Sequence, residues 1–539
     1  MKENSKKISI YLPLIISIAL VFGILLGLGL SRNQQMGGSG LLLYPKNDKL
    51  NDVIKYIEEE YVDTVSVKKL TDDAIVNLLK DLDPHSVYIP SEELQSVNEP
   101  LEGNFSGIGV QFNIINDTVI VISTIPNGPS ALLGIMPGDR IIKVNGSNVA
   151  GVKMSSENIV KQLKGPEGTM VKVTIKRPGS KKELIFDIKR NKIPLYSIDV
   201  AYMLNDETGY IKISQFARTT EDEFYNAATK LKSKGMKKLV LDLRGNPGGY
   251  LEAAKSLAEQ FLKEGDLIVY TQGRTKPRKD YRAEAAGTCK DIELAVLIDE
   301  FSASASEIFA GAIQDNDRGL IIGRRSFGKG LVQDQVILSD GSAIRLTIAR
   351  YYTPTGRCIQ RPYNHGEEDY FKDINRRYIH GELENRDSIH FNDSLKYKTP
   401  KGKIVYGGGG IMPDIFVPYD TSGYTKFFIE ARDMNLIYKF AFNYSDLNRS
   451  TLKTFNDLGS FIDYLEKNNI FDQFVNYCRK KEVYATHKEL GISKKLITTQ
   501  VEAYIARNFF DNEGFYPVIR QIDNTLDKAV EVLSPRNEN

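Results

Sequence analysis

An uncharged stretch near the N-terminus sets the first constraint on this chain. Residues 8–30 follow Lys2, Lys6 and Lys7 and contain no Asp, Glu, Lys or Arg. A helix of about 23 residues, rising 1.5 Å per residue, crosses the roughly 30 Å hydrocarbon core of a bilayer. With the lysines inside, an anchor in residues 1–31 leaves everything that follows on the extracytoplasmic, periplasmic side. A cleaved signal peptide is the competing interpretation, although its apolar region is normally shorter and followed by a clearer small-residue site.

The rest of the chain is long enough for several domains. At about 150 residues per domain, the 539 residues would make three or four. Lys and Arg number 71 and Asp and Glu 69, which gives a formal charge of +2 and no electrostatic excess to attract nucleic acid. The three cysteines, Cys289, Cys358 and Cys478, are an odd number without zinc-ligand spacing. We therefore expect no nucleic-acid partner, no cofactor and no metal.

The pattern of apolar residues predicts a multidomain protein of α+β and α/β character. Residues 32–100 form a spacer and a helical segment, and residues 101–190 form a small module of strands and turns. In residues 191–424, strands alternate with helices, which is typical of an α/β layered core. Within it, residues 360–403 are dense in charge and predict a solvated excursion. Residues 425–539 predict a helical unit of unknown role.

A serine-rich corner is the first candidate for chemistry. Residues 302–307 read SASASE, follow an apolar strand and open a helix. A strand-to-helix corner exposes a side chain beside free N–H groups, which suits an acyl-transfer nucleophile because those groups stabilise an oxyanion. Ser304 with Glu307 three residues later is also a capping box, so the hexapeptide alone does not decide between the two roles.

A nucleophilic serine needs a base, and the positions of the histidines do not favour one of them. The five are His85, His365, His380, His390 and His487, none near the serine corner in sequence. Lys329 lies between glycines at the entrance to a strand, where partial desolvation would lower its pKa towards the working pH. Gln333 lies four residues on, on the same strand face, where its amide can orient the amine. A solvent-exposed lysine in a glycine turn is the competing interpretation.

These residues resemble the active-site block of the carboxyl-terminal processing, or tail-specific, serine peptidases, which use a Ser-Lys dyad. The block here is SASASEIFAGAIQDNDRGLIIGRRSFGKGLVQ, residues 302–333. The segments LDPHSVY (82–88), LDLRGNPGG (241–249), YYTPTGR (351–357) and GIMPD (410–414) are similar to further family motifs. The resemblance covers roughly residues 50–420, with Ser326 where threonine is common. It implies a ClpP/crotonase-like core, with Ser304 as nucleophile, Lys329 as base and Gln333 as its support.

Two glycine loops acquire roles from the same resemblance. Residues 246–249, Asn-Pro-Gly-Gly, lie between a strand and a helix, so their N–H groups can approach a substrate carbonyl, although a plain βα turn has the same pattern. The resemblance implies an oxyanion hole from Ala305 and either Gly248 or Gly249. The small strand module resembles a PDZ domain whose carboxylate-binding loop would be Gly107, Ile108, Gly109 and Val110.

The sequence thus predicts a membrane-anchored serine endopeptidase that recognises substrate C-termini through its PDZ domain. Its expected partners are proteins or peptides with free C-termini and the membrane, through residues 8–30; a homo-oligomer or an activating adaptor is left open. A PDZ scaffold with an inactive core is the alternative from another class, and the filled positions 304, 329 and 333 favour the enzyme. An acyl-CoA-type enzyme on a similar core has no basic nucleotide pocket to support it.

Overall fold

The computed structural model describes residues 49–285, 287–364, 366–390 and 392–534. The predicted anchor, residues 8–30, and the spacer after it lie outside the described residues. Among the helices of the described ranges, none has both the length and the apolar character of a membrane span. The chain divides into two compact units, residues 1–75 and 76–539. In the first lies α2 (Lys49–Glu60), and α3 (Val67–Lys80) runs through the division.

The small strand module is an antiparallel sheet in the order β3-β4-β5-β7-β8, with β6 paired to β5. Its elements are β2 (Asn104–Gly107), β3 (Val110–Ile115), β4 (Thr118–Thr124), α5 (Pro129–Leu132), β5 (Arg140–Val144), β6 (Ser147–Asn148), α6 (Ser156–Leu163), β7 (Met170–Lys176), β8 (Glu183–Lys189) and β9 (Asn191–Pro194). Strand β2 pairs with β9 and closes the module at its entry and exit. Val119 and Val121 are fully buried in the module's core beside Ile159 of α6.

A mostly parallel sheet forms the centre of the α/β core, in the order β10-β11-β12-β15-β16-β21. Its strands are β10 (Ile198–Met203), β11 (Thr208–Ile213), β12 (Lys238–Asp242), β15 (Glu293–Ile298), β16 (Leu320–Gly323) and β21 (Ile415–Phe416). Only the β10–β11 pair in this order is antiparallel. Helices α7 (Thr220–Ser233), α8 (Leu251–Glu259) and α9 (Ala305–Asp315) alternate with these strands. This confirms the predicted mixed α/β character.

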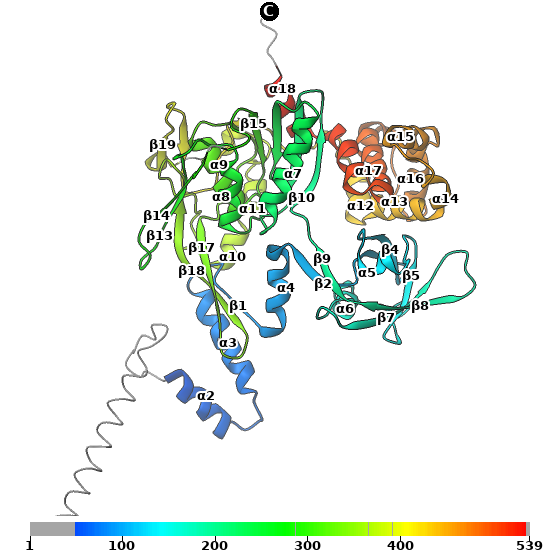
Figure 1. Cartoon of the computed structure of the whole chain (residues 1–539), viewed down its shortest axis with the longest axis horizontal. Coiled ribbons are helices and arrows are strands. Elements are labelled where there is room, and N and C mark those ends of the chain that lie inside the picture. Colours follow the sequence, from blue (N-terminus) through cyan, green and yellow to red (C-terminus); the bar gives the residue numbers. More distant parts are fainter. Residues whose placement is uncertain (1–48, 286, 365, 391, 535–539) are drawn as a thin grey trace, which may run out of the picture. The chain divides into compact units, whose positions relative to one another are not determined.

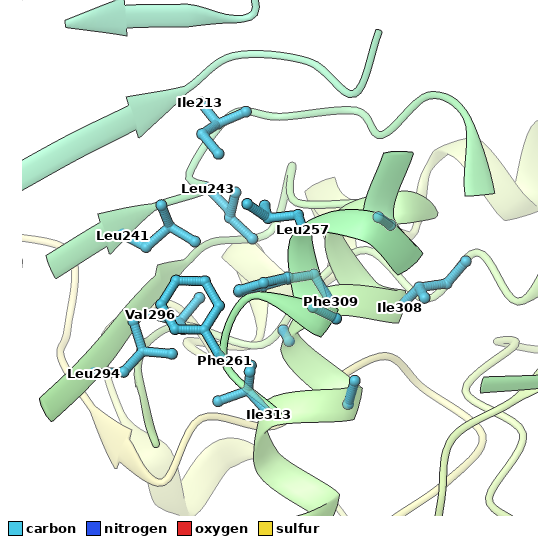
Figure 2. Packing of buried hydrophobic residues seen from close by; sticks show 14 of the residues in the cluster. Ile213, Leu241, Leu243, Leu257, Phe261, Leu294, Val296, Ile308, Phe309 and Ile313 are labelled. Carbon is cyan, nitrogen blue, oxygen red and sulfur yellow. The ribbon is translucent and has the colours of Figure 1, made fainter. Parts of the chain in front are cut away.

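Both faces of this sheet are covered, as parallel sheets require. On one face, Leu241 and Val296 pack with Leu257 of α8 and Phe309 of α9 (Figure 2). On the other, alternate residues of the same strands pack against α18 (Asn524–Leu533), which comes from the predicted C-terminal unit. The last helix of the chain is therefore part of the core that positions the site.

A second, antiparallel sheet carries the segment with Lys329 and Gln333. Its strands are β1 (Val87–Ile89), β13 (Leu267–Gln272), β14 (Lys279–Arg282), β17 (Leu331–Ile337) and β18 (Ala343–Tyr352). Strand β18 pairs with β1, β13 and β17. Strand β1 belongs to the segment predicted as helical, and α4 (Ser91–Glu102) continues from it to β2. The N-terminal segment is thus built into the core sheet.

The solvated excursion predicted for residues 360–403 is wrong for its central part. This region contains α10 (Glu367–Phe371), α11 (Asp373–Ile379), η1 (Arg386–Ser388), η2 (Asp393–Leu395), β19 (Lys396–Lys398) and β20 (Ile404–Tyr406). Tyr370 and Arg377 are buried, and Arg361 is buried with its guanidinium 3.9 Å from the ring centres of both Phe327 and Tyr370. Asp373 pairs with both arginines at 2.8 Å. The charge density comes partly from buried arginines paired with the partly buried Asp373, which composition cannot distinguish from a solvated surface.

The remaining C-terminal helices form a unit with its own apolar core, built largely of phenylalanines such as Phe440, Phe461 and Phe474. They are α12 (Lys426–Asp433), α13 (Leu436–Leu447), α14 (Arg449–Leu452), α15 (Leu458–Lys467), α16 (Ile470–Arg479), α17 (His487–Ile519) and η3 (Arg520–Ile522). Figure 1 shows them as the orange and red bundle. We call residues 426–519 the helical unit.

Candidate active site

Ser304 occupies a strained corner between β15 and α9. Its backbone has φ 53° and ψ −112°, in a region that L-residues rarely adopt. Such strain persists where surrounding structure enforces it, and it is characteristic of nucleophiles on sharp strand-to-helix turns. Gly248 has φ 101°, and a Cβ there would lie 2.7 Å from the Ala303 carbonyl oxygen and 2.8 Å from the Ala305 nitrogen. Only glycine therefore lets this loop approach the serine corner.

Lys329 is partly buried at the entrance to β17. Its Nζ donates to Gln333 Oε1 at 3.2 Å. The expected shared strand face does not bring them together, because Lys329 precedes the first residue of β17 and the pairing with β18 shifts register between Val332 and Gln333. Desolvation lowers the pKa of the Lys329 ammonium, and the nearby charge of Arg345 lowers it further. Gln333 is held from its other end, because its Nε2 donates to the His85 carbonyl oxygen. The lysine therefore lies in surroundings that favour the neutral amine.

Glu307 connects the serine corner to the lysine loop. Its side chain is fully buried, and its Oε2 accepts from the N–H groups of Ser304 and Lys329, each at 2.9 Å. Its Oε1 accepts from Gly328 N–H at 2.7 Å and from the Ser326 hydroxyl at 2.5 Å. Burial raises the pKa of this carboxyl, while the four donors oppose the shift. The sequence predicts Glu307 only as half of a capping box; its link to residues 326–329 depends on the tertiary structure.

Ser304, Lys329, Gln333, Gly248 and Gly249 line one cavity of about 670 Å³. The structure thus brings the predicted nucleophile, base and support together with the glycine loop. No hydrogen bond joins the Ser304 hydroxyl to Lys329 Nζ in the part of the chain that is described. Catalytic hydrogen bonds are often long without substrate and shorten only in the productive complex, so this geometry is compatible with a dyad.

The N–H groups around the cavity differ in their availability. Gly248 N–H donates to Asn246 Oδ1 at 2.8 Å, and Asn246 Nδ2 is itself bound to the Ile213 carbonyl oxygen at 3.0 Å. Within the described residues, the N–H groups of Gly249 and Ala305 have no acceptor. Of the two glycines that the sequence left open, Gly248 therefore has its N–H bound to Asn246, whereas the described residues provide no acceptor for that of Gly249.

None of the four histidines that the structure describes lines the cavity. His380, His390 and His487 are exposed, and His365 lies outside the described residues. The His85 Nε2 is 2.9 Å from the Tyr370 hydroxyl, and burial, followed by the charge of Lys329, lowers the pKa of its imidazole to about 3. His85 is therefore neutral and contacts the Lys329–Gln333 pair through its backbone.

The predicted carboxylate-binding loop leads directly into an edge strand. The Ile108 carbonyl oxygen accepts from the Ser130 N–H at 3.1 Å and from its hydroxyl at 2.6 Å, and Gly109 has φ 71°. In the sheet as described, β3 pairs only with β4, so its other edge is open to an added strand. Gly107 and Val110 are the last residue of β2 and the first of β3. Across the described ranges, no group of three or more His, Cys, Asp or Glu residues could hold a metal.

Three protein-family models match parts of this chain. The model of peptidase family S41 matches residues 207–366, the PDZ domain model residues 95–176, and a family of unknown function, DUF8443, residues 427–511. The solved photosystem II D1 C-terminal processing protease is 25% identical and aligns over 70% of this chain and 94% of its own, with a TM-score of 0.36.

Two curated relatives carry matching names. Carboxy-terminal processing protease CtpB of Bacillus subtilis is 35% identical over 317 residues, 58% of this chain; the match spans 65% of that protein, less than two thirds. The carboxy-terminal-processing protease of Bartonella bacilliformis is 37% identical over 322 residues, 59% of this chain and 73% of that protein. The resemblance predicted from the motifs is thereby confirmed, and the chain belongs to the carboxy-terminal processing proteases of peptidase family S41.

Proposed function

We propose that this protein is a membrane-anchored serine endopeptidase in which Ser304 is the nucleophile and Lys329 the general base. The observation that carries the proposal is the cavity lined by both residues, in which desolvation lowers the pKa of the lysine. A base is most effective when its pKa lies near the working pH. Gln333 orients the amine through its 3.2 Å hydrogen bond.

In the proposed reaction, Lys329 accepts and then donates each proton that is transferred. The neutral amine takes the Ser304 proton as Oγ attacks the scissile carbonyl carbon. The resulting oxyanion accepts hydrogen bonds from the N–H groups of Gly249 and Ala305. The Lys329 ammonium then protonates the leaving amine as the C–N bond breaks. Lys329 next takes a proton from water, which attacks the acyl-enzyme, and returns that proton to Ser304.

Substrates are proposed to be proteins or peptides with a free C-terminus. The loop of Gly107, Ile108, Gly109 and Val110 precedes the open edge of β3, where an extended peptide can add as a strand. Successive backbone N–H groups in such a loop receive a carboxylate. The PDZ family model over residues 95–176 supports this assignment.

We expect the full chain in detergent to cleave a peptide ending in a free carboxylate and small or apolar residues. The same peptide with an amidated end should be bound and cleaved at least about tenfold less well, because the loop loses its anionic ligand. Cleavage rates measured by mass spectrometry test this. Ser304→Ala should bind the free-carboxylate peptide normally and release no product; cleavage by that variant would overturn the nucleophile assignment, and a wild-type protein that binds without cleaving would be a scaffold.

The membrane part of the proposal rests on residues 8–30 and the lysines before them. We expect a periplasm-active reporter fused after Gly40 to be active, since positive charges stay on the cytoplasmic side. The protein should remain with membranes after washing in high salt. Activity only of a cytoplasmic reporter would contradict this topology. Recovery of a mature form that begins near Ser31 would replace the anchor with a signal peptide.

A further inference from the structure

Strand β4 of the PDZ module is apolar on both faces. Val119 and Val121 point into the module's core, whereas Ile120 and Ile122 point to the opposite face. An antiparallel sheet with one solvated face carries polar residues at those alternate positions. Here Ile120 and Ile122 are only 6% and 8% exposed. The second face of this sheet, which we call the back face, is therefore covered.

Helix α13 of the helical unit provides the cover. Phe442, at 1% exposure, forms an apolar cluster with Ile120 and Ile122, and Ile115 of β3 packs against it. The buried Phe442 thus packs with apolar residues of the PDZ module.

A carboxylate aligns the two surfaces. Arg140 of β5 donates from Nη2 to Asp446 Oδ2 at 2.6 Å, and Arg449 Nε lies 4.0 Å from Asp446 Oδ1. The Arg449 side chain also packs on Gly138, where a Cβ would come within 3.1 Å of Nε. The Asp446 side chain is only 17% exposed. Removing one partner of a largely buried pair leaves an uncompensated charge. Shifting the PDZ module relative to α13 would therefore leave the Asp446 carboxylate without Arg140.

The helical unit is also attached to the protease core. Near the end of α17, the Tyr516 hydroxyl donates to Asp199 Oδ2 at 2.7 Å, and Asn512 Nδ2 donates to the Asp199 carbonyl oxygen at 3.1 Å. Asp199 belongs to β10 of the central sheet. None of the contacts on the back face involves residues 107–110 or α6, so the peptide-binding edge is left open.

We propose that the helical unit, which matches a family of unknown function, is an intramolecular docking partner for the back face of the PDZ module. It ties the module to the core through α13 and α17, in addition to the covalent connections at β2 and β9. Its role is to fix where the module holds a bound C-terminus relative to the Ser304 cavity.

Charge reversal across the pair of Arg140 and Asp446 tests this in the full chain in detergent. Asp446→Arg and Arg140→Asp should each speed amide hydrogen exchange in β4 and β5 by about tenfold or more, because the back face separates from α13. The double variant restores a pair of opposite charges and should recover most of the protection. The measurement is made in the Ser304→Ala background, so it is independent of catalysis.

Two controls make the outcome decisive. Lys143→Asp, also on β5, changes a side chain whose Nζ lies 4.0 Å from Glu183 Oε2, and should leave exchange near that of the parent protein. All variants should still bind the free-carboxylate peptide, which shows that the module is folded. Unchanged exchange in both single variants, or additive loss in the double variant, would overturn the docking role. A failure of the Ser-Lys chemistry would not affect this result.

Discussion

Lys329→Ala is expected to reduce turnover by about 10⁴-fold, since a positioned general base contributes up to about this factor. Lys329→Arg should be equally inactive, because guanidinium stays protonated and cannot accept the serine proton. Both variants should fold and bind the free-carboxylate peptide, because among the described residues Lys329 Nζ makes a single hydrogen bond, to Gln333. Single-turnover cleavage rates with purified variants provide the measurement.

The proposed role of Lys329 predicts the direction in which kcat/KM changes with pH. Only neutral Lys329 accepts a proton, so kcat/KM should rise with pH as the ammonium deprotonates. Because desolvation and Arg345 lower the pKa of Lys329, the rise should be centred below the ordinary lysine value of about 10.4. A rise centred at or above that value would argue against lysine desolvation as the activating effect.

Further single variants test whether the general base is Lys329 or a histidine. Gln333→Ala should lower turnover by about tenfold to a hundredfold, less than Lys329→Ala, because the amide orients the amine without transferring a proton. Single alanine changes of the histidines should leave a measurable rate: His85, His365, His380, His390 and His487. The dyad would have to be abandoned if Lys329→Ala kept near-normal turnover while one histidine change abolished it.

Glu307→Ala is expected to produce the largest loss of stability among the site variants. It would leave three backbone N–H groups and the Ser326 hydroxyl without their acceptor. An unsatisfied buried donor costs about 1–3 kcal/mol, so the free energy of unfolding should fall by at least about 3 kcal/mol. Chemical denaturation in the Ser304→Ala background, which prevents self-cleavage, would measure it.

Glu307→Gln tests positioning more gently, because the side chain keeps its size. One of its two polar ends becomes an NH₂ group that cannot accept from the facing N–H donors. We expect kcat to fall by about a hundredfold with KM little changed, since misplacement of Ser304 relative to Lys329 affects the reacting geometry.

Glu300→Gln is the matched control for this position. Glu300 is also buried and pairs with Arg324 at 2.8 Å, but it does not line the cavity. It should lose stability while retaining kcat. If Glu307→Gln lost stability to the same extent and retained kcat as well, Glu307 would be a structural residue without a positioning role.

The sequence alone determined the parts of the site that are local in the chain. The serine corner follows directly from a strand-to-helix junction, and Lys329 and Gln333 are only four residues apart in the chain. The PDZ loop and the alternation of strands and helices are likewise local patterns. Local sequence patterns predict these features because residues close together in the chain determine the local backbone geometry.

Only the tertiary structure decided which distant groups complete the site. The donors that converge on Glu307 come from residues 304 and 326–329, and the His85 carbonyl oxygen that holds Gln333 is 248 positions away. Local spacing carries no information about such pairings. Charge composition was misleading at residues 360–403 for the related reason that an arginine such as Arg361 can be buried when a carboxylate, here that of Asp373, pairs with it. The back face of the PDZ module also depends on distant residues. The apolar Ile120 and Ile122 indicate that another part of the protein covers this face, but only the tertiary structure shows that Phe442 does so.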